Sequence, residues 1–250
     1  MTGKKSLFLT FGIALIGLSL LLVSGNSVKS RSQADFRIFR GTAANFLPVG
    51  EEITYDIKLG KLRLGSAVFH HAAGIEADGR RLYVMTFKTR VGRFRDTETI
   101  YSDAETLLPV KINRDILNWL RKEKITEEYD QENFSVTITK EVGRRTKETV
   151  IRKDAVIQNA ILLPHYLRRM QELKPGYNFI VNLPTRTLRI MFSSIDRIRV
   201  PAGEFETFHF ESSPRQIEIW ISADQRRIPV KMLGLGAFKY EMVLKRYKLE

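Results

Sequence analysis

The sequence feature that most constrains the fold is an alternation of apolar and polar residues with a period of two, which recurs along most of the chain. In residues 51–59, for example, Ile53, Tyr55 and Ile57 alternate with polar or charged side chains. This alternation is typical of a β-strand with one face in the core and the other in water. Because short turn signals separate such segments, we expect neighbouring strands to pair as antiparallel hairpins.

The turns between these segments have recognisable chemistry. Asp78-Gly79 is a hairpin signal, and Pro201-Ala202-Gly203 is a second tight turn between two alternating segments. Residues 116–120 fit either a helical turn or a strand, and we favour a strand. Many short strands indicate a mainly β protein, in which one antiparallel sheet curls into a barrel or half-barrel. The other strands are expected at residues 51–59, 62–72, 82–89, 94–101, 122–129, 134–140, 146–151, 178–183, 188–200, 204–211, 216–222, 229–233 and 237–245.

One segment between two groups of strands departs from the period of two and is predicted to be helical. Asp154 can cap a helical turn over residues 155–160, and Pro164 stands where a first helical position is expected. The sequence Lys174-Pro175-Gly176 ends the segment. The alternative to a single sheet is a division into two domains at this helix, since each half would fit the lower end of domain size.

The predicted helix has one apolar side. Its stripe should pack against the concave side or the open end of the sheet, because only burial stabilises so short a helix in water. Arg168 and Arg169 are then expected to face solvent. We favour a helix that plugs the core over one that forms a mobile lid. The stripe consists of Leu163, Tyr166, Leu167 and Met170, within a helix from Pro164 to Leu173.

The N-terminal segment carries a targeting signal. Lys4 and Lys5 precede an apolar run from Leu7 to Val23, and the small residues Ser24 and Gly25 follow. These are the parts of a secretory signal peptide, although the run is also long enough to act as an uncleaved membrane anchor. We therefore expect a signal peptide or anchor helix in residues 1–25, a linker in residues 26–47 and the β domain in residues 48–250.

The charge around this segment bears on its orientation. Four basic residues after the apolar run would favour a cytoplasmic location by the positive-inside rule, but long folded domains translocate largely regardless of charge. We therefore expect a protein that is exported to the periplasm, either released or anchored to the cytoplasmic membrane and facing the periplasm. The four residues are Lys29, Arg31, Arg37 and Arg40.

The chain is strongly basic. Its formal net charge is +13, or +11 once Lys4 and Lys5 are set aside. Such an excess favours anionic partners such as phospholipid headgroups or acidic polysaccharide, and the export signal argues against nucleic acid. The basic residues do not form a block of five or more, so a solvated basic face explains them as well as an anion-binding surface does.

The sequence contains no recognisable catalytic constellation. The absence of cysteine excludes disulfides, thiolate metal sites, a cysteine nucleophile and a bacterial lipoprotein anchor. His70 and His71 are adjacent on one strand and point to opposite faces, while His165 has no acidic residue four positions away. The pairs Glu51-Glu52 and Glu127-Glu128 also divide between two strand faces. We expect structural or surface histidines, and no catalytic residue, cofactor or metal.

The remaining candidates for a site are large apolar side chains. In a mainly β protein most aromatic residues pack in the core or on strand faces. The alternative is that some of them line an apolar cavity inside a barrel too wide for side chains to fill, with the helix as its lid. The candidate ligand or lid residues are Leu163, Tyr166, Met170, Trp119 and Trp220.

Six segments of the sequence form a recognisable series, namely Val49-Gly-Glu-Glu-Ile-Thr-Tyr-Asp-Ile57, Leu64-Gly-Ser-Ala67, Ile157-Gln-Asn-Ala-Ile-Leu-Leu-Pro-His-Tyr-Leu-Arg-Arg169, Pro175-Gly176, Val200-Pro-Ala-Gly-Glu-Phe-Glu-Thr-Phe208 and Trp220-Ile-Ser-Ala-Asp-Gln-Arg-Arg-Ile-Pro-Val-Lys231. In this order and spacing they resemble a bacterial exported family called domain of unknown function 3108. The resemblance covers about Val49 to Leu244 and implies a signal-bearing envelope protein with a barrel-like β domain, no established activity and no catalytic residues to transfer. The chain departs from the family pattern in a more basic segment after Gly143 and in Pro164.

These features together predict a non-enzymatic envelope protein that binds a lipid or an acidic glycan in a curved β-sheet. One alternative is an enzyme that modifies envelope polysaccharide or lipid with dispersed aspartate, glutamate and histidine residues. The other is a structural assembly factor that acts by contact with a protein partner, which the sequence does not identify.

Overall fold

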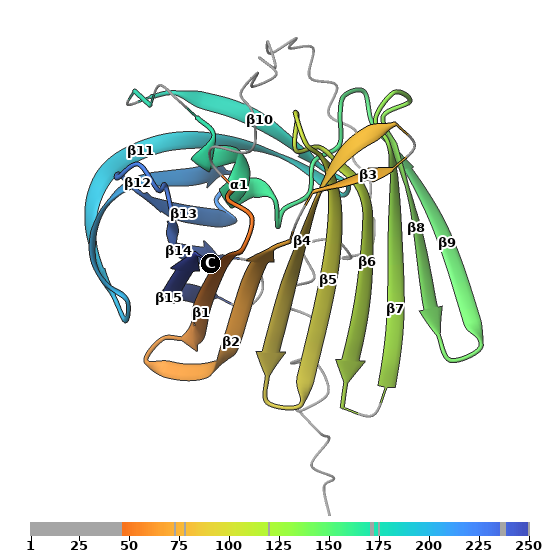
Figure 1. Cartoon of the computed structure of the whole chain (residues 1–250), viewed down its shortest axis with the longest axis horizontal. Helices are drawn as coiled ribbons and strands as arrows, with labels where there is room; N and C mark the ends of the chain where they lie inside the picture. The colour runs from red at the N-terminus through yellow and green to blue at the C-terminus, as the bar shows by residue number, and fades with distance from the viewer. Residues whose placement is uncertain are drawn as a thin grey trace, which may run out of the picture.

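An antiparallel sheet of 15 strands makes up most of the computed structural model, and a short helix lies on its concave side (Figure 1). The structure describes residues 47–249 except 73, 78, 120, 171–172, 175 and 236–238. The strands are β1 (Glu51–Leu59), β2 (Leu62–His71), β3 (Ile75–Ala77), β4 (Arg80–Val91), β5 (Phe94–Asp103), β6 (Pro109–Asn118), β7 (Arg121–Asp130), β8 (Ser135–Val142), β9 (Arg145–Arg152), β10 (Asn178–Leu183), β11 (Arg186–Val200), β12 (Gly203–Ser213), β13 (Ile217–Ser222), β14 (Pro229–Gly234) and β15 (Tyr240–Leu249), and the helix is α1 (Leu163–Arg168).

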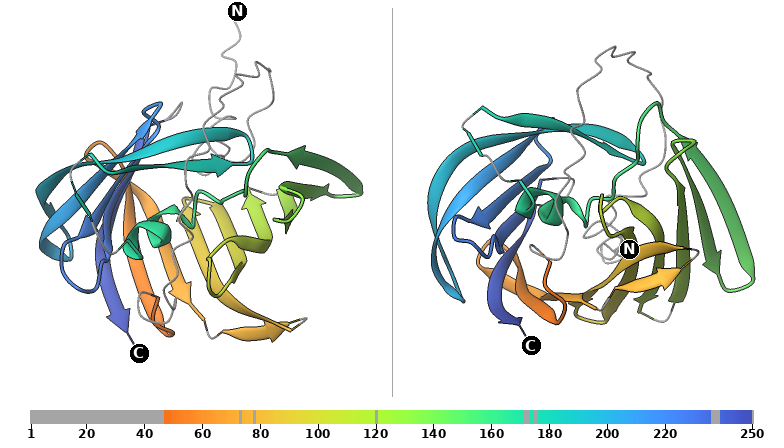
Figure 2. Two further views of the ribbon diagram at one scale, coloured as in Figure 1. Left: turned by 90° about the horizontal axis from the view of Figure 1, so that it is seen from above. Right: turned by 45° about the horizontal axis from the view of Figure 1, so that its top comes forward.

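Most neighbouring strands of the sheet are consecutive in the sequence, and one further pair joins the last strand to the first. Across the sheet the order is β10-β11-β12-β13-β14-β15-β1-β2-β4-β5-β6-β7-β8-β9, and β3 pairs with β4. The last strand, β15, therefore lies beside the first, β1, in the middle of the sheet. The chain runs outward from β1 to β9, crosses the concave side through α1, and returns from β10 to the centre (Figure 2).

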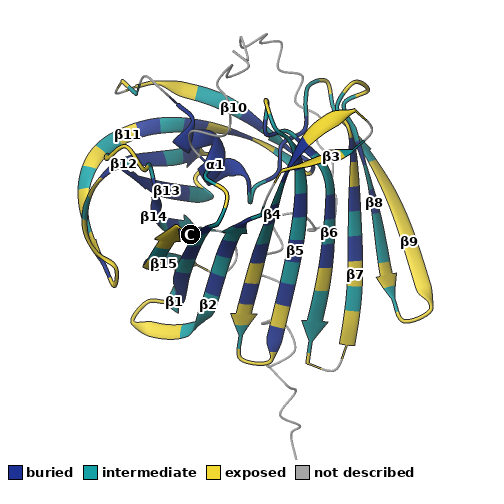
Figure 3. Cartoon of the chain, viewed as in Figure 1, coloured by how far each residue is buried: buried dark blue, intermediate teal, exposed yellow. Residues whose placement is uncertain are grey.

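The sheet is open, with β9 and β10 at its two edges. The sequence predicted either a barrel or a half-barrel, and the described strands form the open one of these two arrangements. The edge strand β9 is almost wholly exposed and carries Arg145, Lys147, Glu148 and Arg152 (Figure 3). Charged side chains on an edge strand discourage pairing with another chain, so they allow this edge to stay uncovered.

The sheet curves most strongly where strands β10 to β15 wrap around α1 (Figures 1 and 2). Irregular pairing accompanies this curvature. The register between β1 and β15 shifts at Thr54 and Tyr55, where Lys245 of β15 is the extra residue, and the register between β11 and β12 shifts at Phe192 and Ser194. An extra residue of this kind bends a strand and increases its twist, which lets a sheet of many strands curl around a core.

The core lies on the concave side and follows the period of two predicted from the sequence. In β5 the residues at alternate positions, from Phe94 to Ser102, are all buried. In β1 the residues Ile53, Tyr55 and Ile57 are at most 2% exposed. Most of the strands expected from the alternation are present within about two residues of the predicted bounds, and residues 116–118 are part of a strand as expected. The last strand, β15, spans Tyr240–Leu249 where residues 237–245 were expected, and β3 and residues 109–115 of β6 were not predicted.

The helix is much shorter than predicted. Residues 155–160 are not helical, since they lie alongside the ends of two strands and bond to them. Gln158 N donates to Asn182 O at 2.8 Å, and Asn182 N donates to Gln158 Oε1 at 2.7 Å. Gln131 makes a similar reciprocal pair with Ile157, at 2.9 and 3.0 Å. These side-chain amides form hydrogen bonds with backbone groups of the extended segment. Those groups therefore do not need the hydrogen bonds of a helix.

The apolar stripe of the predicted helix is buried, but the prediction for the two arginines is wrong. Leu163, Tyr166, Leu167 and Met170 belong to the core, and α1 packs against β13. Arg168 and Arg169, which were expected in solvent, are 1% and 4% exposed. Arg168 is paired with a buried carboxylate, and Arg169 NH2 donates to Glu105 O. Charged groups can be buried in this way only because partners replace their water.

The predicted signal or anchor helix and linker fall in residues 1–47, and all but Leu47 lie outside the described residues. In the part of the chain that the structure describes, no helix is both long enough and apolar enough to span a membrane.

Candidate functional site

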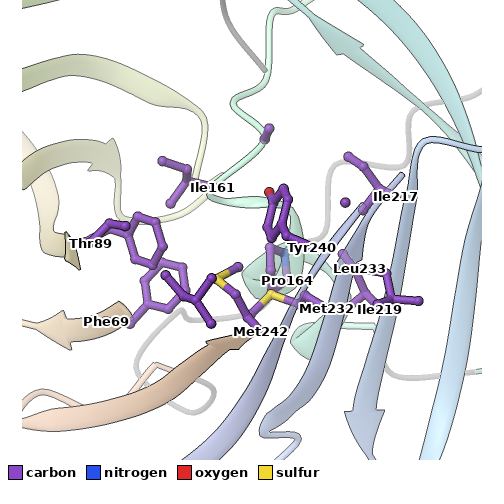
Figure 4. Close-up of a pocket in the computed structure, with 14 residues that line it drawn as sticks. Phe69, Thr89, Ile161, Pro164, Ile217, Ile219, Met232, Leu233, Tyr240 and Met242 are labelled. Atoms are coloured by element: carbon purple, nitrogen blue, oxygen red, sulfur yellow. The ribbon is translucent and has the colours of Figure 1, made fainter. Parts of the chain in front are cut away.

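The best candidate for a binding site is an apolar pocket of about 90 Å³ between α1 and the concave face of the sheet. Figure 4 shows Phe69 and Thr89 on one side, Ile217 and Ile219 on the other, and Tyr240 between them. The pocket is partly open. Its walls come from six strands and the segment that leads into α1, namely Ile57, Phe69, Phe87, Thr89, Ala160, Ile161, Pro164, Ile217, Ile219, Met232, Leu233, Gly234, Tyr240 and Met242.

The pocket forms because alternate residues of neighbouring strands face the same side. Ile217 and Ile219 of β13 are two positions apart, and so are Tyr240 and Met242 of β15. Met232 of β14 pairs directly with Met242. Methionine side chains are flexible and polarisable, so this wall can adapt to apolar groups of different shapes.

Gly234 controls the position of Tyr240 in the pocket. The two residues pair across β14 and β15. A Cβ atom placed on Gly234 would lie 2.3 Å from Cε1 of the Tyr240 ring, which is far closer than real contacts allow. Only glycine therefore lets the ring lie over β14 and close this side of the pocket.

Stacked aromatic rings form the opposite side. Phe69 and Phe87 stack with their ring centroids 4.2 Å apart. Phe69 also makes edge-to-face contacts with Tyr55 and His165 at 6.1 and 5.0 Å. Because these rings are packed on the side away from the pocket as well, they form a fixed apolar wall.

Two polar groups interrupt the apolar lining. Thr89 Oγ1 is buried and has no hydrogen-bond partner among the described residues. Burial and, to a smaller extent, the neighbouring Glu98 carboxylate raise the pKa of the Tyr240 hydroxyl to about 12. Tyr240 is therefore a neutral phenol at physiological pH. The pocket thus offers hydroxyl groups and no charge to a ligand.

A buried charged cluster lies beside the pocket on the same face. Glu98 pairs directly with Phe87 in the pocket wall, and directly paired residues share a face. Arg114 Nε donates to Asp96 at 2.9 Å and lies 3.5 Å from Glu98 Oε1. On β7, Glu127 accepts a short hydrogen bond from a tyrosine hydroxyl. One arginine thus lies among three carboxylates.

The excess of carboxylates affects their protonation. Burial raises the pKa of Glu98 well above its ordinary value; Arg114 opposes this rise, and Asp96 and Glu127 add to it. Burial also raises the pKa of Glu127, against the hydrogen bond from Tyr129. Carboxyl groups in such a setting retain protons at a higher pH than exposed ones, as a general acid requires.

A second buried cluster fixes α1 to the sheet behind the pocket. Arg168 NH1 and NH2 each lie 2.6 Å from an oxygen of Glu51. His71 Nδ1 lies 2.8 Å from Glu51 Oε2, and the ring of His165 packs edge-on against His71 at 4.9 Å. Burial alone would raise the pKa of Glu51, but hydrogen bonds from Arg168 and His71 outweigh it and hold the pKa at about 2. Burial lowers the pKa of both histidines.

The site residues expected from the sequence do not line this pocket. Leu163, Tyr166 and Met170 are buried in the core beside it, and Tyr166 OH donates to Leu107 O at 3.1 Å. Trp220 lies on the opposite face of β13 from Ile219 and stacks on a histidine. Trp119 is 60% exposed, with Arg93 5.7 Å from its ring.

Little in the sequence indicated that the residues which line the pocket would form a site. Gly234, at the end of β14 and directly after the predicted strand 229–233, was a usable signal, because glycine in or next to a strand often marks a close approach of another group. The facing positions of Met232 and Met242 depend on the pairing of β14 with β15 and could not be read from either strand alone.

Comparisons with known proteins give one family match. The family model described as Protein of unknown function (DUF3108) matches residues 54–243. No curated protein matches the chain.

Three of the solved structures that match the chain have low sequence identity to it. The crystal structure of a β-barrel-like protein of domain of unknown function DUF1849 from Brucella abortus has 12% identity and a TM-score of 0.49, and covers 81% of this chain and 98% of that one. A candidate exported protein with a YmcC-like fold from Bacteroides fragilis has 10% identity, a TM-score of 0.28 and coverages of 80% and 96%. A candidate lipoprotein from Parabacteroides distasonis has 8% identity, a TM-score of 0.30 and coverages of 81% and 96%.

Proposed function

The chain belongs to the DUF3108 family of proteins of unknown function, and from this premise we propose that it is an exported cell-envelope protein that binds a lipid by an acyl chain, without catalysing a reaction. The observation that carries the proposal is the apolar pocket under α1, where Thr89 and Tyr240 are the only polar side chains among the described residues that line it. Pockets for small molecules are typically apolar, with a few polar groups that orient the ligand.

The size of the pocket supports binding of part of a lipid. A dry cavity of about 150 Å³ can hold a molecule such as benzene, so the present 90 Å³ suits the end of a hydrocarbon chain. Burial of about four methylene groups would contribute about 3 kcal/mol. The opening of the pocket leaves room for the rest of the lipid outside.

The charge and the N-terminal segment support an envelope location. Lys4, Lys5 and the apolar run that follows have the composition of a secretory signal or anchor. The net charge of +13 attracts the protein to anionic lipid surfaces. An acidic glycan is a less suitable ligand for the pocket itself, because none of the described residues that line it is basic.

Photo-crosslinking of the full-length chain in the bacterial envelope tests this proposal. A photoreactive phenylalanine analogue at Ile161, which lines the pocket, should give adducts with the mass of a lipid. The same analogue at the exposed Val150 of β9 is the matched control and should give none. Lipid adducts at both positions, or at neither, would contradict binding in the pocket.

One observation favours a second candidate, an enzyme that modifies envelope lipid or polysaccharide. Glu98 lies next to the pocket wall with a raised pKa, so it could donate a proton to a leaving group there. Incubation of the protein with envelope lipids, followed by mass spectrometry of the products, tests this function. Product that forms with the wild type and is lost in Glu98→Gln would establish the enzyme; no product from either protein would exclude it for those substrates.

A further inference from the structure

The face of the sheet opposite the pocket carries a third cluster of polar side chains, which contains a histidine and two glutamates. His209 and Glu211 are two positions apart on β12, so they point to the same side. Glu218 of β13 pairs directly with Glu211. Two strands therefore place one imidazole and two carboxylates together, and each of the three residues offers an atom within 4.8 Å of the others.

The distances suit coordination of one ion. His209 Nε2 lies 3.4 Å from Glu218 Oε2 and 3.8 Å from Glu211 Oε1. Around a tetrahedral zinc ion with bonds of about 2.0–2.1 Å, two ligand atoms lie about 3.4 Å apart. Small side-chain movements would therefore bring the three atoms to one centre.

The orientation of His209 is fixed by its other nitrogen. Nδ1 lies 3.3 Å from Asp196 Oδ2 and 3.4 Å from the hydroxyl of Ser194. Asp196 is itself held, because Ser194 Oγ and Trp220 Nε1 donate to its two oxygens at 2.8 and 2.9 Å. An Asp196 carboxylate beside Nδ1 favours a proton on that nitrogen, which leaves the lone pair on Nε2 directed at the two glutamates.

The imidazole ring is also held in place by stacking. The rings of His209 and Trp220 are 4.1 Å apart and nearly parallel, with an angle of 8° between their planes. His209 is only 8% exposed, yet Nε2 has no hydrogen-bond partner among the described residues. A buried nitrogen in a fixed orientation with no hydrogen bond is a position at which a ligand is expected.

The two carboxylates are also placed where they could bind a cation. Arg215 donates to Glu218 Oε1 at 2.7 Å through Nε, and its NH2 lies 2.6 Å from the same oxygen. Oε2 of Glu218, the oxygen near His209, is therefore left for a cation. Glu211 and Glu218 face each other across the strands as like charges, which is unfavourable unless a positive group lies between them.

We propose that His209, Glu211 and Glu218 bind a divalent transition-metal ion such as Zn²⁺, with Asp196 as the positioning residue for His209. The imidazole favours Zn²⁺ and related ions over Mg²⁺ and Ca²⁺, which prefer sites made of oxygen alone. The side chain of Glu211 is 30% exposed, so the ion can enter from solvent and water can complete its coordination. This site is separate from the lipid pocket and does not depend on the proposed function.

Metal analysis of the full-length chain tests the proposal. After incubation with Zn²⁺ and removal of free metal, the wild type should retain one zinc ion per chain. Glu211→Gln keeps the shape of a ligand and removes its charge, and should bind zinc at least about tenfold more weakly. Asp196→Asn should weaken binding about 10- to 100-fold, as expected for a group that orients a metal-binding histidine.

The matched control is Glu206→Gln, which removes the same charge from an exposed position on β12 outside the cluster and should bind zinc as the wild type does. Circular dichroism checks that each variant is folded. Cobalt gives a second measurement, since Co²⁺ in the site should show visible absorption bands that Glu211→Gln lacks. A wild type that retains no zinc, or zinc binding equal in the wild type and Glu211→Gln, would overturn the proposal.

Discussion

Arg168 of α1 and Glu51 of β1 form a buried bidentate ion pair, with two guanidinium nitrogens each 2.6 Å from a carboxylate oxygen. The residues are 117 positions apart, and their side chains are at most 1% exposed. The pair joins the crossover segment to the strand in the middle of the sheet. It therefore fixes α1 in the position where Pro164 closes the pocket.

The first prediction concerns this pair. Arg168→Met should lower the free energy of unfolding by about 3–5 kcal/mol, because it removes the arginine that pairs with the buried Glu51 carboxylate and leaves that carboxylate with the contact from His71. The double variant Glu51→Leu/Arg168→Met should recover a large part of this loss, since no charge then remains buried. Urea unfolding of the four proteins in the cycle measures the coupling. Equal stability of Arg168→Met and the wild type would show that the pair does not hold the helix.

The second prediction is a loss of stability in mild acid. Burial lowers the pKa of His71 and His165 below the ordinary 6.5, so below that pH the unfolded chain binds more protons than the folded one. Unfolding free energy should fall as the pH drops below about 6.5, by up to about 1.4 kcal/mol per pH unit for each histidine. His165→Leu should have a shallower pH dependence between pH 7 and 5; identical slopes would count against the buried neutral histidine.

Glu51 gives a separate effect at lower pH. Its pKa is about 2 in the folded protein against an ordinary value of 4.5, so its contribution is complete above about 4.5 and is lost as the pH falls through 2. Acid unfolding between these values should be less steep in Glu51→Gln than in the wild type.

The third prediction concerns Gly234. Gly234→Ala should displace the Tyr240 ring from the pocket wall and cost about 1–3 kcal/mol, as overpacking does in other cores. It should also reduce crosslinking of lipid at Ile161. Gly74→Ala is the control, because the nearest atom to its added Cβ is a backbone oxygen at 3.4 Å. If both variants behave alike, the close approach of Tyr240 to Gly234 is not what shapes the pocket.

The fourth prediction tests whether α1 is a plug or a lid. Met170 is 2% exposed, so Met170→Ala should cost about 2–5 kcal/mol, the range for truncation of a core residue. Hydrogen exchange of the amides of α1 should then be as slow as that of the central strands β1 and β15. Early exchange of α1, with little loss of stability in Met170→Ala, would instead identify a mobile lid.

The strands could be predicted from the sequence because their signal is local. In β1 and β5 the face that a residue occupies follows from its position in an alternating run. The helix was overestimated because Gln158 and Gln131 provide hydrogen bonds that an extended segment can use, and the partners of those bonds lie 24 and 26 residues away. A local pattern contains no information about such partners.

The sites depended on contacts between distant residues and were largely not predicted. Arg168 has the position of an exposed residue on an amphipathic helix, and its burial depends on Glu51 and on the carbonyl oxygen of Arg226. The expectation of no metal site rested on His70, His71 and His165, whereas the proposed site uses His209. Its ligands combine a strand spacing of two with a cross-strand pair, so they were visible only once β12 and β13 were paired.

Native mass spectrometry of the full-length protein, released gently from detergent, tests the central claim of lipid binding most directly. The wild type should carry an adduct with the mass of an envelope lipid. Ile161→Trp, which fills the pocket, should lose the adduct, while Val150→Trp on the exposed edge strand should keep it. A wild type without lipid, or the same adduct on Ile161→Trp, would contradict the account.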